Sequence, residues 1–494
     1  MEAHLLTLMT FIPLVGFAVI LCLPRDSHNL VKWTAVAATT PPLLMAIWLY
    51  ANFDRSTPGF QFVEKWMWIA PANIEYHMGV DGVSITMVLL TALLCFLCIF
   101  ASWGIDKGVK GYFSLFLLLD TGMTGVFCAL DFFLFFVFWE VMLLPMYFLI
   151  GVWGGPRRVY AAIKFFLYTL VGSALMLVVM LALYFSVDPH TFDLTKLAAA
   201  GSAGAFSENF AFYCWLALFV GFAIKIPAFP FHTWLPDAHV EAPTAVSVIL
   251  AGVLLKMGTY GILRINYPLF PGATQDLAFW FLALLGAVNI VYGALCAMAQ
   301  TDMKKLVAYS SISHMGYVML GMAAFTPEGI NGAVLQMFNH GTVTAMLFLL
   351  VGVIYDRAHH RNIDGFGGLA SIMPVYTGFT AIAFFAALGL PGLSAFISEV
   401  LVLLGAWPTY PVFTVIGASA VILTAGYMLW MMQRVYLGPT NEKYLGFPDV
   451  SPREIFTLAP LAVIVVVLGV YPQAVLDLMM ASLNGLNQIV VAAR

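Results

Sequence analysis

The segment FAIKIPAFPFHTWLPDAH, residues 222–239, places a lysine and three prolines at the end of a long apolar run. Lys225 follows at least ten apolar or small residues, and Pro227 and Pro230 remove backbone N–H donors from any helix that carries it. In a hydrocarbon layer, the carbonyls freed in this way must be met by water or by side chains. The segment therefore predicts a helix that is broken within a membrane, next to a buried charge.

The composition of the whole chain supports a membrane location. Of its 494 residues, 62% are hydrophobic and only 9% are charged, which is too little charge to cover a soluble protein. Apolar runs of about twenty residues recur along the chain and predict a polytopic membrane protein. The first run, residues 5–23, lacks a basic n-region and a small-residue cleavage site, so we expect a retained span. The thinly spread net charge of −4 indicates no nucleic-acid partner.

All six cysteines lie within apolar runs. Cys95 and Cys98 have the spacing of a CxxC motif, but inside a span this pair is expected to pack as small apolar side chains. The sequence therefore predicts no metal site and no redox site at these positions.

The apolar runs predict an all-α protein of about fourteen transmembrane helices, because backbone polar groups must be satisfied within the bilayer. The expected spans are residues 4–24, 30–50, 80–102, 111–130, 132–152, 161–187, 209–235, 242–266, 276–298, 303–324, 329–355, 374–405, 410–436 and 454–476. Between them, residues 51–79 contain the alternating stretch FQFVEKWMWIA with Trp66 and Trp68, which predicts a hairpin at the membrane interface. Residues 188–208 form a second long connection, rich in small and polar residues.

The distribution of Lys and Arg predicts the orientation. Of the 21 basic residues, 14 lie in loops after odd-numbered spans, 5 lie in the other loops or at the termini, and Lys225 and Lys256 lie within spans. Cytoplasmic loops of membrane proteins carry the excess of Lys and Arg. Both termini are therefore expected on the non-cytoplasmic side.

Six ionisable residues fall near the middle of separate spans: Glu140, Lys225, Lys256, His314, His340 and Glu399. Glu140 lies nine residues from the polar end at Asp131, and nine residues of helix rise about 13.5 Å, which is half of a ~30 Å core. The two lysines and two glutamates of this set would together cost about 12 kcal/mol if they faced lipid. We therefore expect all six to face the bundle interior, where opposite charges and water form a proton path.

Other interpretations of these residues remain open. Buried ion pairs can simply hold helices together, and His314 and His340 could ligate a haem, although the usual four-histidine arrangement is absent. Their near-neutral pKa makes both histidines better suited to proton relay. Secondary candidates for the path are Asp120, Asp131, His232 and His239, for which helix capping or turn formation is an equal alternative.

A second interruption resembles the first. In LGLPGLSAFISE, residues 388–399, Gly389, Pro391 and Gly392 precede Glu399. This break lies five spans after the break at Pro227 and Pro230, so the two broken helices are expected to run in opposite directions. That arrangement is typical of an inverted repeat with its working sites at the breaks. Two ordinary proline kinks are the alternative.

The repeat predicts four parts of the chain. These are residues 1–110 with three spans and the outside hairpin, residues 111–266 as the first half (spans 4–8), residues 276–436 as the second half (spans 9–13), and residues 437–494 with one C-terminal span.

Four stretches resemble the antiporter-like subunits of respiratory complex I: FWEVMLLPMYFLIGVWGG (138–155), IKIPAFPFHTWLPDAHVEAPTAVSVILAGVLLKMGTYG (224–261), DMKKLVAYSSISHMGY (302–317) and LGLPGLSAFISE (388–399). The resemblance covers essentially the whole chain and is strongest to the M-type chains, equivalent to mitochondrial chain 4, because the L- and N-type chains usually have lysine where this sequence has Glu399. It implies that Glu140 and Lys225 form the charge pair of one half-channel. It further implies that Lys256 connects the halves, that His314 and His340 continue the polar axis, and that Glu399 ends it.

The resemblance implies a proton-translocating subunit of an NADH:quinone oxidoreductase in the bacterial cytoplasmic (inner) membrane, with a mitochondrial inner membrane as the lesser alternative. L- and N-type chains would flank it. No cofactor is expected in this chain, and FMN, iron–sulfur clusters and quinone would be bound by partner subunits. The main alternative is a subunit of a multi-subunit Na⁺/H⁺ antiporter or of a membrane-bound hydrogenase. A stand-alone substrate carrier and a passive scaffold are further alternatives.

Overall fold

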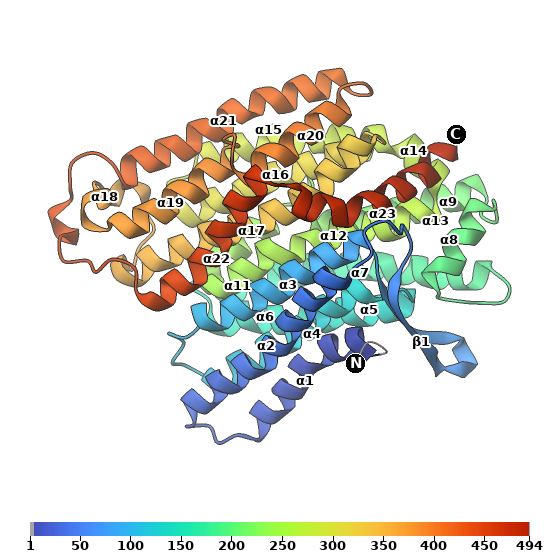
Figure 1. Cartoon of the computed structure of the whole chain (residues 1–494), viewed down its shortest axis with the longest axis horizontal. Coiled ribbons are helices and arrows are strands. Elements are labelled where there is room, and N and C mark those ends of the chain that lie inside the picture. The colour runs from blue at the N-terminus through green and yellow to red at the C-terminus, as the bar shows by residue number, and fades with distance from the viewer. Residues whose placement is uncertain (1–3, 494) are drawn as a thin grey trace.

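The computed structural model describes residues 4–493, and Figure 1 shows a bundle whose helices mostly run along the long axis of the molecule. Within this range, 13 helices are long and apolar enough to cross a membrane. The 21-residue helix α16 (Met303–Ala323) is more polar, and one further crossing is made by two shorter helices. Every span predicted from the sequence therefore coincides with helix. Arg494, counted in the charge distribution, lies outside the described residues.

The elements follow the predicted order. The N-terminal part contains α1 (Leu5–Cys22), α2 (His28–Asn52), β1 (Gln61–Ile69), η2 (Ala70–Ala72), β2 (Ile74–Val80) and α3 (Gly82–Ala101). The next part contains α4 (Val109–Cys128), α5 (Phe132–Val141), α6 (Leu143–Trp153), α7 (Arg158–Ser186), α8 (Leu194–Ser202), α9 (Glu208–Lys225), α10 (Trp234–Glu241), α11 (Thr244–Ile249), η3 (Leu250–Leu254), α12 (Leu255–Gly261), η4 (Ile262–Asn266) and α13 (Tyr267–Leu269).

The remaining elements are α14 (Pro271–Ala278), η5 (Phe279–Leu284), α15 (Leu285–Met298), α16, α17 (Pro327–Ala358), η6 (Ile363–Gly365), α18 (Leu369–Ile372), α19 (Pro374–Ala387), α20 (Ser394–Ala406), α21 (Pro411–Val435), η7 (Glu442–Tyr444), α22 (Pro452–Val470) and α23 (Gln473–Ala492). The two broken helices occupy equivalent places. Helices α9 and α10 pack on α7, and α19 and α20 pack on α17. This arrangement is the one expected from the predicted repeat.

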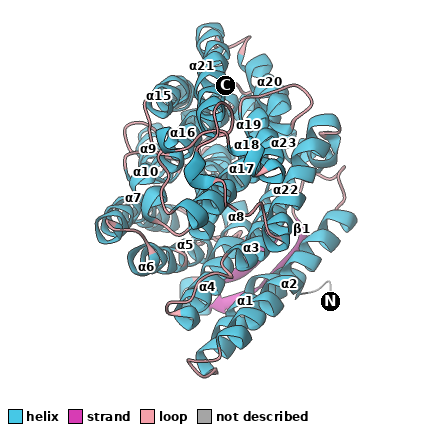
Figure 2. Cartoon of the chain, turned by 90° about the vertical axis from the view of Figure 1, so that its left-hand side faces the viewer, coloured by secondary structure: helices cyan, strands magenta, loops and turns pink. Residues whose placement is uncertain are grey.

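Burial separates central helices from peripheral ones. The apolar windows of α17 and of the segment from α11 to α13 are 100% buried, whereas those of α1 and α21 are 39% and 33% buried. Figure 2 looks along the bundle, with α1 and α2 at one edge and α21 at the opposite edge. Because the windows of α1 and α21 leave most of their residues uncovered, these helices face lipid or partner chains. Lys256 and His340 lie on the two central elements.

The predicted interface hairpin is confirmed. Strands β1 and β2 pair antiparallel, with Trp66 opposite Tyr76. Glu64 on β1 is buried and accepts a hydrogen bond from the backbone N–H of Leu6 at 2.7 Å, so the hairpin caps the first turn of α1. Trp66 and Trp68 remain 42% and 48% exposed, as aromatic side chains at a membrane interface do.

Two features differ from the sequence prediction. The small and polar connection 188–208 contains helix α8, because Asp193 accepts hydrogen bonds from the backbone N–H groups of Thr195 and Lys196 and so starts a helix there. The final span was expected to continue to residue 476, but α22 ends at Val470 and a further helix, α23, follows Pro472.

Helix α23 lies across one end of the bundle. Its polar side chains contact the ends of other elements: Ser482 accepts from the N–H of Gly82 at 2.9 Å, Asn484 accepts from Asn331 at 3.2 Å, and Asn487 donates to the carbonyl of Phe325 at 3.1 Å. The three contacts fall at the start of α3, at the start of α17 and just after α16. The sequence prediction of a single C-terminal span was therefore incomplete, because it missed α23.

Candidate functional site

The first helix break is held by side-chain hydrogen bonds. Residues 226–233 between α9 and α10 are non-helical. Asn289 on α15 accepts from the N–H of Phe229 at 2.8 Å and donates to the carbonyl of Pro227 at 3.2 Å. Trp234 donates to the carbonyl of Ile224 at 2.8 Å. The expectation that side chains or water must meet the freed backbone groups is confirmed at these positions.

Lys225 is the last residue of α9, directly before the break, and is 1% exposed. Its ammonium lies 3.7 Å from the sulfur of Met142 and above the rings of Trp139 and Phe165, at 5.2 and 5.6 Å from their centres. Aromatic faces and a thioether stabilise a buried ammonium weakly compared with a carboxylate. The immediate surroundings of Lys225 are therefore apolar and polarisable rather than anionic.

Glu140 lies on α5 near Lys225, but the two side chains form no ion pair within 4 Å among the described residues. The buried carboxylate oxygen Oε1 of Glu140 has no hydrogen-bond partner there. The structure therefore places the two members of the expected charge pair in one region, without an ion pair between them.

Lys256 is fully buried on α12 and contacts the second half of the chain directly. Its Nζ donates to Nδ1 of His340 at 2.6 Å and to the carbonyl of Ala251 at 2.5 Å. Ala251 belongs to the π-helical turn η3, which directly precedes α12. Single π-helical turns inside α-helices are frequent at functional sites.

Glu399 ends a second cluster. His314 on α16 lies 3.0 Å from its Oε1 through Nδ1, and Gln336 on α17 donates to the same oxygen at 3.3 Å. Ser398 donates to Oε1 of Gln336 at 2.5 Å, and Asn339 donates to Ser398 at 3.1 Å. All five side chains are buried. The carboxylate is thus held by groups from two neighbouring helices, α16 and α17.

The two clusters meet at the histidines. The rings of His314 and His340 have centres 5.9 Å apart, and both Nε2 atoms are buried without a hydrogen-bond partner in the described part of the chain. A cavity of about 10 Å³ is lined by both histidines, Ser310, Gln336 and Thr344. This is about the space that one water molecule needs, and the lining supplies the polar groups that would hold it.

At the second helix break, the backbone of the loop lies close to Glu399. Gly389 and Gly392 in the loop between α19 and α20 have φ of +77° and +93°, which L side chains rarely adopt. A Cβ atom on Gly389 would lie 3.0 Å from Oε2 of Glu399, whereas one on Gly392 would meet no atom within 4 Å. Gly389 therefore allows the carboxylate to lie against the broken backbone.

The secondary candidates divide into two kinds. His239 is fully buried, stacks on Phe348 at 4.6 Å, and has no partner on either ring nitrogen. His232 contacts the hydroxyl of Tyr292 at 3.1 Å near the first break.

The two aspartates have local roles. Asp131 caps α5 by accepting from the N–H of Leu134 at 3.1 Å, and burial raises its pKa to about 6. Asp120 lies one turn before Thr124, which donates to it at 3.4 Å. Helix capping, which the sequence offered as the alternative to a role in the proton path, is therefore observed for Asp131.

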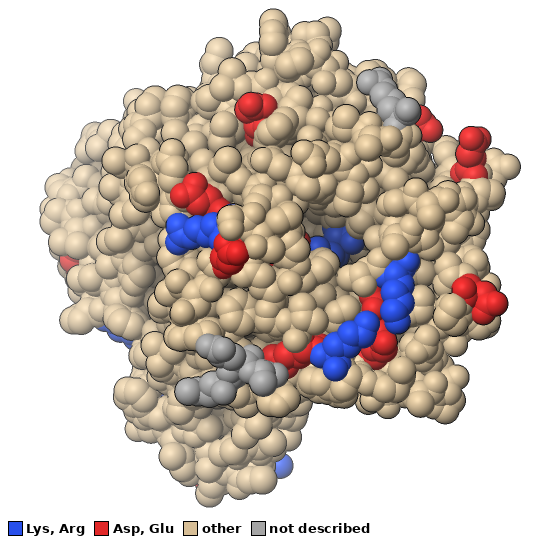
Figure 3. Space-filling model, turned by 45° about the vertical axis from the view of Figure 1, so that its right-hand side comes forward, with Lys and Arg blue, Asp and Glu red and all other residues tan. Residues whose placement is uncertain are grey.

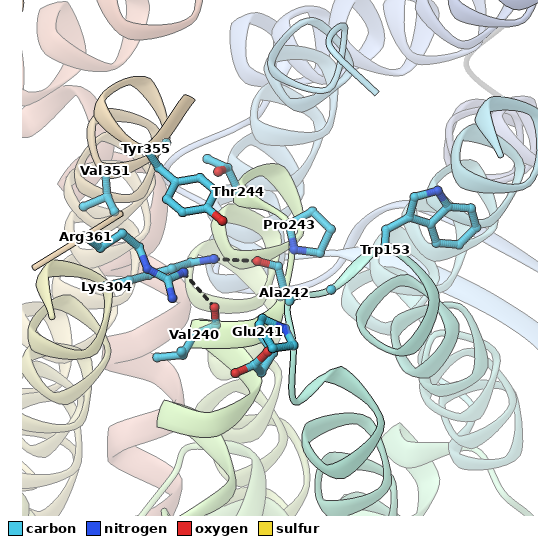
Figure 4. A pocket seen from close by; sticks show the side chains of 14 residues that line it. Trp153, Val240, Glu241, Ala242, Pro243, Thr244, Lys304, Val351, Tyr355 and Arg361 are labelled. Carbon is cyan, nitrogen blue, oxygen red and sulfur yellow. Dashed lines mark hydrogen bonds between the residues drawn. The ribbon is translucent and has the colours of Figure 1, made fainter. Parts of the chain in front are cut away.

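An open cavity of about 170 Å³ lies at the end of the bundle rich in basic residues, and its lining includes Val240, which follows His239 in the chain (Figure 4). Lys304, 4% exposed, donates to the carbonyl of Ala242, and Arg361 donates to that of Val240. The charged side chains whose fields act on His239 are Lys304 and Lys256. His239 is thus near both Lys304, which lines the cavity, and the central Lys256.

One group of metal-ligand type occurs among residues 4–493, formed by Glu75, His77 and Asp193 below the hairpin. Lys65 already supplies a cation there, at 2.9 Å from Glu75 and 2.6 Å from Asp193. Burial opposes ionisation of Asp193, but hydrogen bonds from His77 and Lys65 outweigh it and hold its pKa below the usual range. The cluster ties the hairpin to the start of α8.

The sequence prediction named all six central ionisable residues but missed their uncharged partners. Asn289, Gln336 and Asn339 are amides within long apolar runs, and that pattern was a usable signal because an amide inside a bilayer needs a partner. Lys304 was placed in a loop, whereas it is buried at the start of α16.

Comparison with known proteins gives consistent matches. Residues 129–424 match the family described as NADH:quinone oxidoreductase/Mrp antiporter, TM. NADH-quinone oxidoreductase subunit M of Rickettsia bellii is 42% identical, covering 98% of this chain and 99% of the relative. The subunit M of Rhodobacter capsulatus is 45% identical over 98% and 96%, and NADH-ubiquinone oxidoreductase chain 4 of Arabidopsis thaliana is 43% identical over 96% and 95%.

Two solved assemblies contain a chain of the same fold. One is respiratory complex I from Thermus thermophilus with bound NADH, with a TM-score of 0.88, 31% identity, and coverage of 98% of this chain and 99% of that one. The other is the Mrp complex from Dietzia sp., with a TM-score of 0.86, 22% identity, and coverage of 100% and 99%. The second likeness shows the shared fold alone.

Proposed function

The chain belongs to the membrane subunits of the NADH:quinone oxidoreductase/Mrp antiporter family and, within it, to the M-type subunits of NADH:quinone oxidoreductase, and from that premise we propose how it moves protons. Protons pass along a central row of buried side chains formed by Lys256, His340, His314 and Glu399. The antiporter alternative has less support, since the curated relatives at 41–45% identity carry the subunit M or chain 4 name.

The observation that carries this proposal is the direct contact between the two halves, continued by the neighbouring histidines. Lys256 touches His340, the rings of His340 and His314 are neighbours, and His314 touches Glu399. Ionisable groups within a bilayer are costly. A buried row of them across four helices is therefore better explained by movement of charge than by a role in helix packing.

Glu140 and Lys225 provide the control step. When the carboxylate approaches Lys225, the charge pair favours the protonated lysine; when it withdraws, burial favours release of the proton. The released proton would move toward Lys256, on the neighbouring helix, through water near the break. The present separation of the two side chains corresponds to the releasing state.

The driving energy must come from outside this chain. Moving one charge against 100 mV requires about 2.3 kcal/mol. We place the redox groups, namely FMN, iron–sulfur clusters and quinone, in partner subunits, with L- and N-type chains on either side of this one. Conformational or electrostatic signals from these neighbours would set the Glu140–Lys225 separation.

We further propose that protons enter from the cytoplasmic side through the cavity of Figure 4. The cavity opens at the end of the bundle that carries the excess of Lys and Arg, which supports a cytoplasmic position for this end and the opposite side for both termini. From there, Lys304 and His239 lead to Lys256. Glu399 would release the proton toward the other side.

The test uses the complete purified complex in sealed vesicles. Lys225→Ala and Glu140→Ala are expected to assemble and still oxidise NADH, but to abolish the share of proton translocation that depends on this chain. Lys443→Ala and Glu442→Ala, both in an exposed loop, are the matched controls. A normal ratio of protons to electrons in the Lys225 and Glu140 variants would refute the proposal.

A further inference from the structure

A second open cavity lies at the end of the bundle opposite to that of Figure 4, and nothing in the proton path uses it. Its volume is about 420 Å³, within the range of small-ligand sites. It is enclosed by the approach to the hairpin, the start of α3, helix α8, the segment from η4 to α13, and helix α23. Figure 3, which brings this side forward, shows a hollow with basic atoms inside it, in a surface with few charges.

The polar part of this outer cavity is a buried ion pair. Arg264 and Asp81 lie 2.6 Å apart, with side chains only 11% and 9% exposed. The guanidinium is held between the rings of Phe60 and Tyr260, at 4.8 and 5.2 Å, and also donates to the hydroxyls of Tyr260 and Ser84. Burial opposes ionisation of Asp81, but Arg264 holds its pKa below the usual range. Both members are therefore charged.

The ion pair leaves one donor and one acceptor unused. The hydrogen bonds of Arg264 come from Nε and Nη2, so Nη1 has no partner within residues 4–493. Asp81 accepts from Arg264 and from the N–H groups of Val83 and Ser84 through Oδ1, which leaves Oδ2 for a further donor. A ligand that offers an anionic oxygen beside a hydrogen-bonding cation matches this pattern.

The rest of the lining is apolar. It comprises Pro58, Phe60, Leu194, Ala198, Leu263, Pro268, Leu486 and Ile489. The hairpin beside the cavity carries exposed Trp66 and Trp68, which places the cavity at the level of a membrane interface. A ligand with a zwitterionic head and an apolar body is found at that level.

We propose that this outer cavity binds the headgroup of a phospholipid that carries both a phosphate and a primary ammonium. The phosphate oxygen accepts from Nη1 of Arg264, the ammonium donates to Oδ2 of Asp81, and the glycerol and upper acyl chains lie along the apolar lining. Because the Arg264–Asp81 pair is neutral overall, it gives little net attraction to a purely anionic lipid. A quaternary choline ammonium has no N–H to donate to Asp81.

The test measures lipids retained by the complete purified complex. The complex is stripped of lipid with detergent, exposed to an equimolar mixture of phosphatidylethanolamine, phosphatidylglycerol and phosphatidylcholine, washed, and analysed by mass spectrometry of this chain with its bound lipids. Gly485→Leu adds side-chain volume at the lining of the cavity and leaves both members of the ion pair in place, since a Cβ there meets only Pro58 at 3.5 Å. Gly446→Leu, in an open loop, is the matched control.

The wild-type chain and the Gly446→Leu control are expected to retain phosphatidylethanolamine. Gly485→Leu is expected to retain at least tenfold less of this lipid. Asp81→Asn, which keeps the cap oxygen but replaces Oδ2 by a donor, is expected to lower the preference for phosphatidylethanolamine over phosphatidylcholine. Equal retention in Gly485→Leu and wild type would overturn the proposal, as would equal binding of all three lipids to the wild-type chain. The result is independent of proton translocation, because the outer cavity shares no residue with the proton path.

Discussion

The Nζ of Lys256 lies 2.6 Å from Nδ1 of His340, although the two residues are separated by 84 positions and belong to different halves of the chain. Two basic groups at this distance in a buried site do not both carry a positive charge, because two positive charges there would repel strongly. A proton that arrives at one group therefore displaces a proton from the other. Under the proposed function, this contact is the relay that joins the two central helices.

His340→Gln tests the relay. Glutamine can accept a hydrogen bond from Lys256 but does not titrate, so the complex is expected to assemble, to retain NADH oxidation, and to translocate fewer protons per electron. The ratio is measured in sealed vesicles with a pH-sensitive dye and an NADH assay. His360→Gln, in a loop outside the bundle, is the control. An unchanged ratio in His340→Gln would show that the proton does not pass through this side chain.

Thr244→Cys tests proton uptake through the cavity of Figure 4, which Thr244 lines. In a background where Cys22 and Cys296 are replaced by serine, a membrane-impermeant thiol reagent is expected to label residue 244 from the cytoplasmic side only, and to slow proton translocation. Thr57→Cys, exposed near the hairpin, is the control and is expected to react from the opposite side. Labelling of both positions from one side would contradict the orientation. Labelling of residue 244 without slower translocation would exclude the cavity as the uptake path.

The sequence was sufficient for the spans and for the central residues. Apolar runs define the helices because the bilayer forces backbone hydrogen bonds to stay within each segment. Counting rise per residue placed His314 and His340 at similar depth, and the structure brings them together with Lys256 and Glu399. The predicted depth in the membrane was informative because ionisable side chains are costly in lipid and face the interior of the bundle. Side chains at the same depth therefore lie near one another there.

The rest depended on contacts between distant segments. Nothing in the local pattern around Glu140 says that its carboxylate stays apart from Lys225, since that separation depends on how α5 packs on α7 and α9. Helix α23 was missed because Asn484 and Asn487 interrupt its apolar pattern, and their partners, Asn331 and the carbonyl of Phe325, are more than 150 residues away. Such pairings are not encoded by periodicity.

Asn289→Leu tests the support of the first break. The amide satisfies the N–H of Phe229 and the carbonyl of Pro227, and removing it leaves two buried backbone groups without partners, at a cost of about 1–3 kcal/mol each. We expect a lower apparent melting temperature of the complex and impaired proton translocation. Gln300→Leu, which removes an amide bonded only to the carbonyl of Cys296 near the end of the same helix, is the control. Equal melting temperatures for Asn289→Leu and wild type would show that water replaces the amide.

Asp131→Asn tests the electrostatic cost at the start of α5. Because burial raises the folded-state pKa of Asp131 to about 6, above the usual value of 3.8, ionisation opposes folding. The stability that depends on this group is therefore highest below pH 4 and falls as the pH rises to about 6, by about 3 kcal/mol at most. Asparagine keeps the cap but does not ionise. The variant is expected to raise the apparent melting temperature at pH 7.5 and to change it little at pH 4.5; the opposite trend would show that the charge stabilises the fold.

Gly389→Ala separates backbone strain from displacement of Glu399. Both Gly389 and Gly392 adopt positive φ, so alanine at either position strains the break by about 1–2 kcal/mol. Only at residue 389 does the added methyl press on Oε2 of Glu399, at 3.0 Å. We therefore expect similar losses in melting temperature for Gly389→Ala and Gly392→Ala, but a clear loss of proton translocation for Gly389→Ala alone. Equal translocation in the two variants would mean that the exact position of the Glu399 carboxylate does not limit proton release.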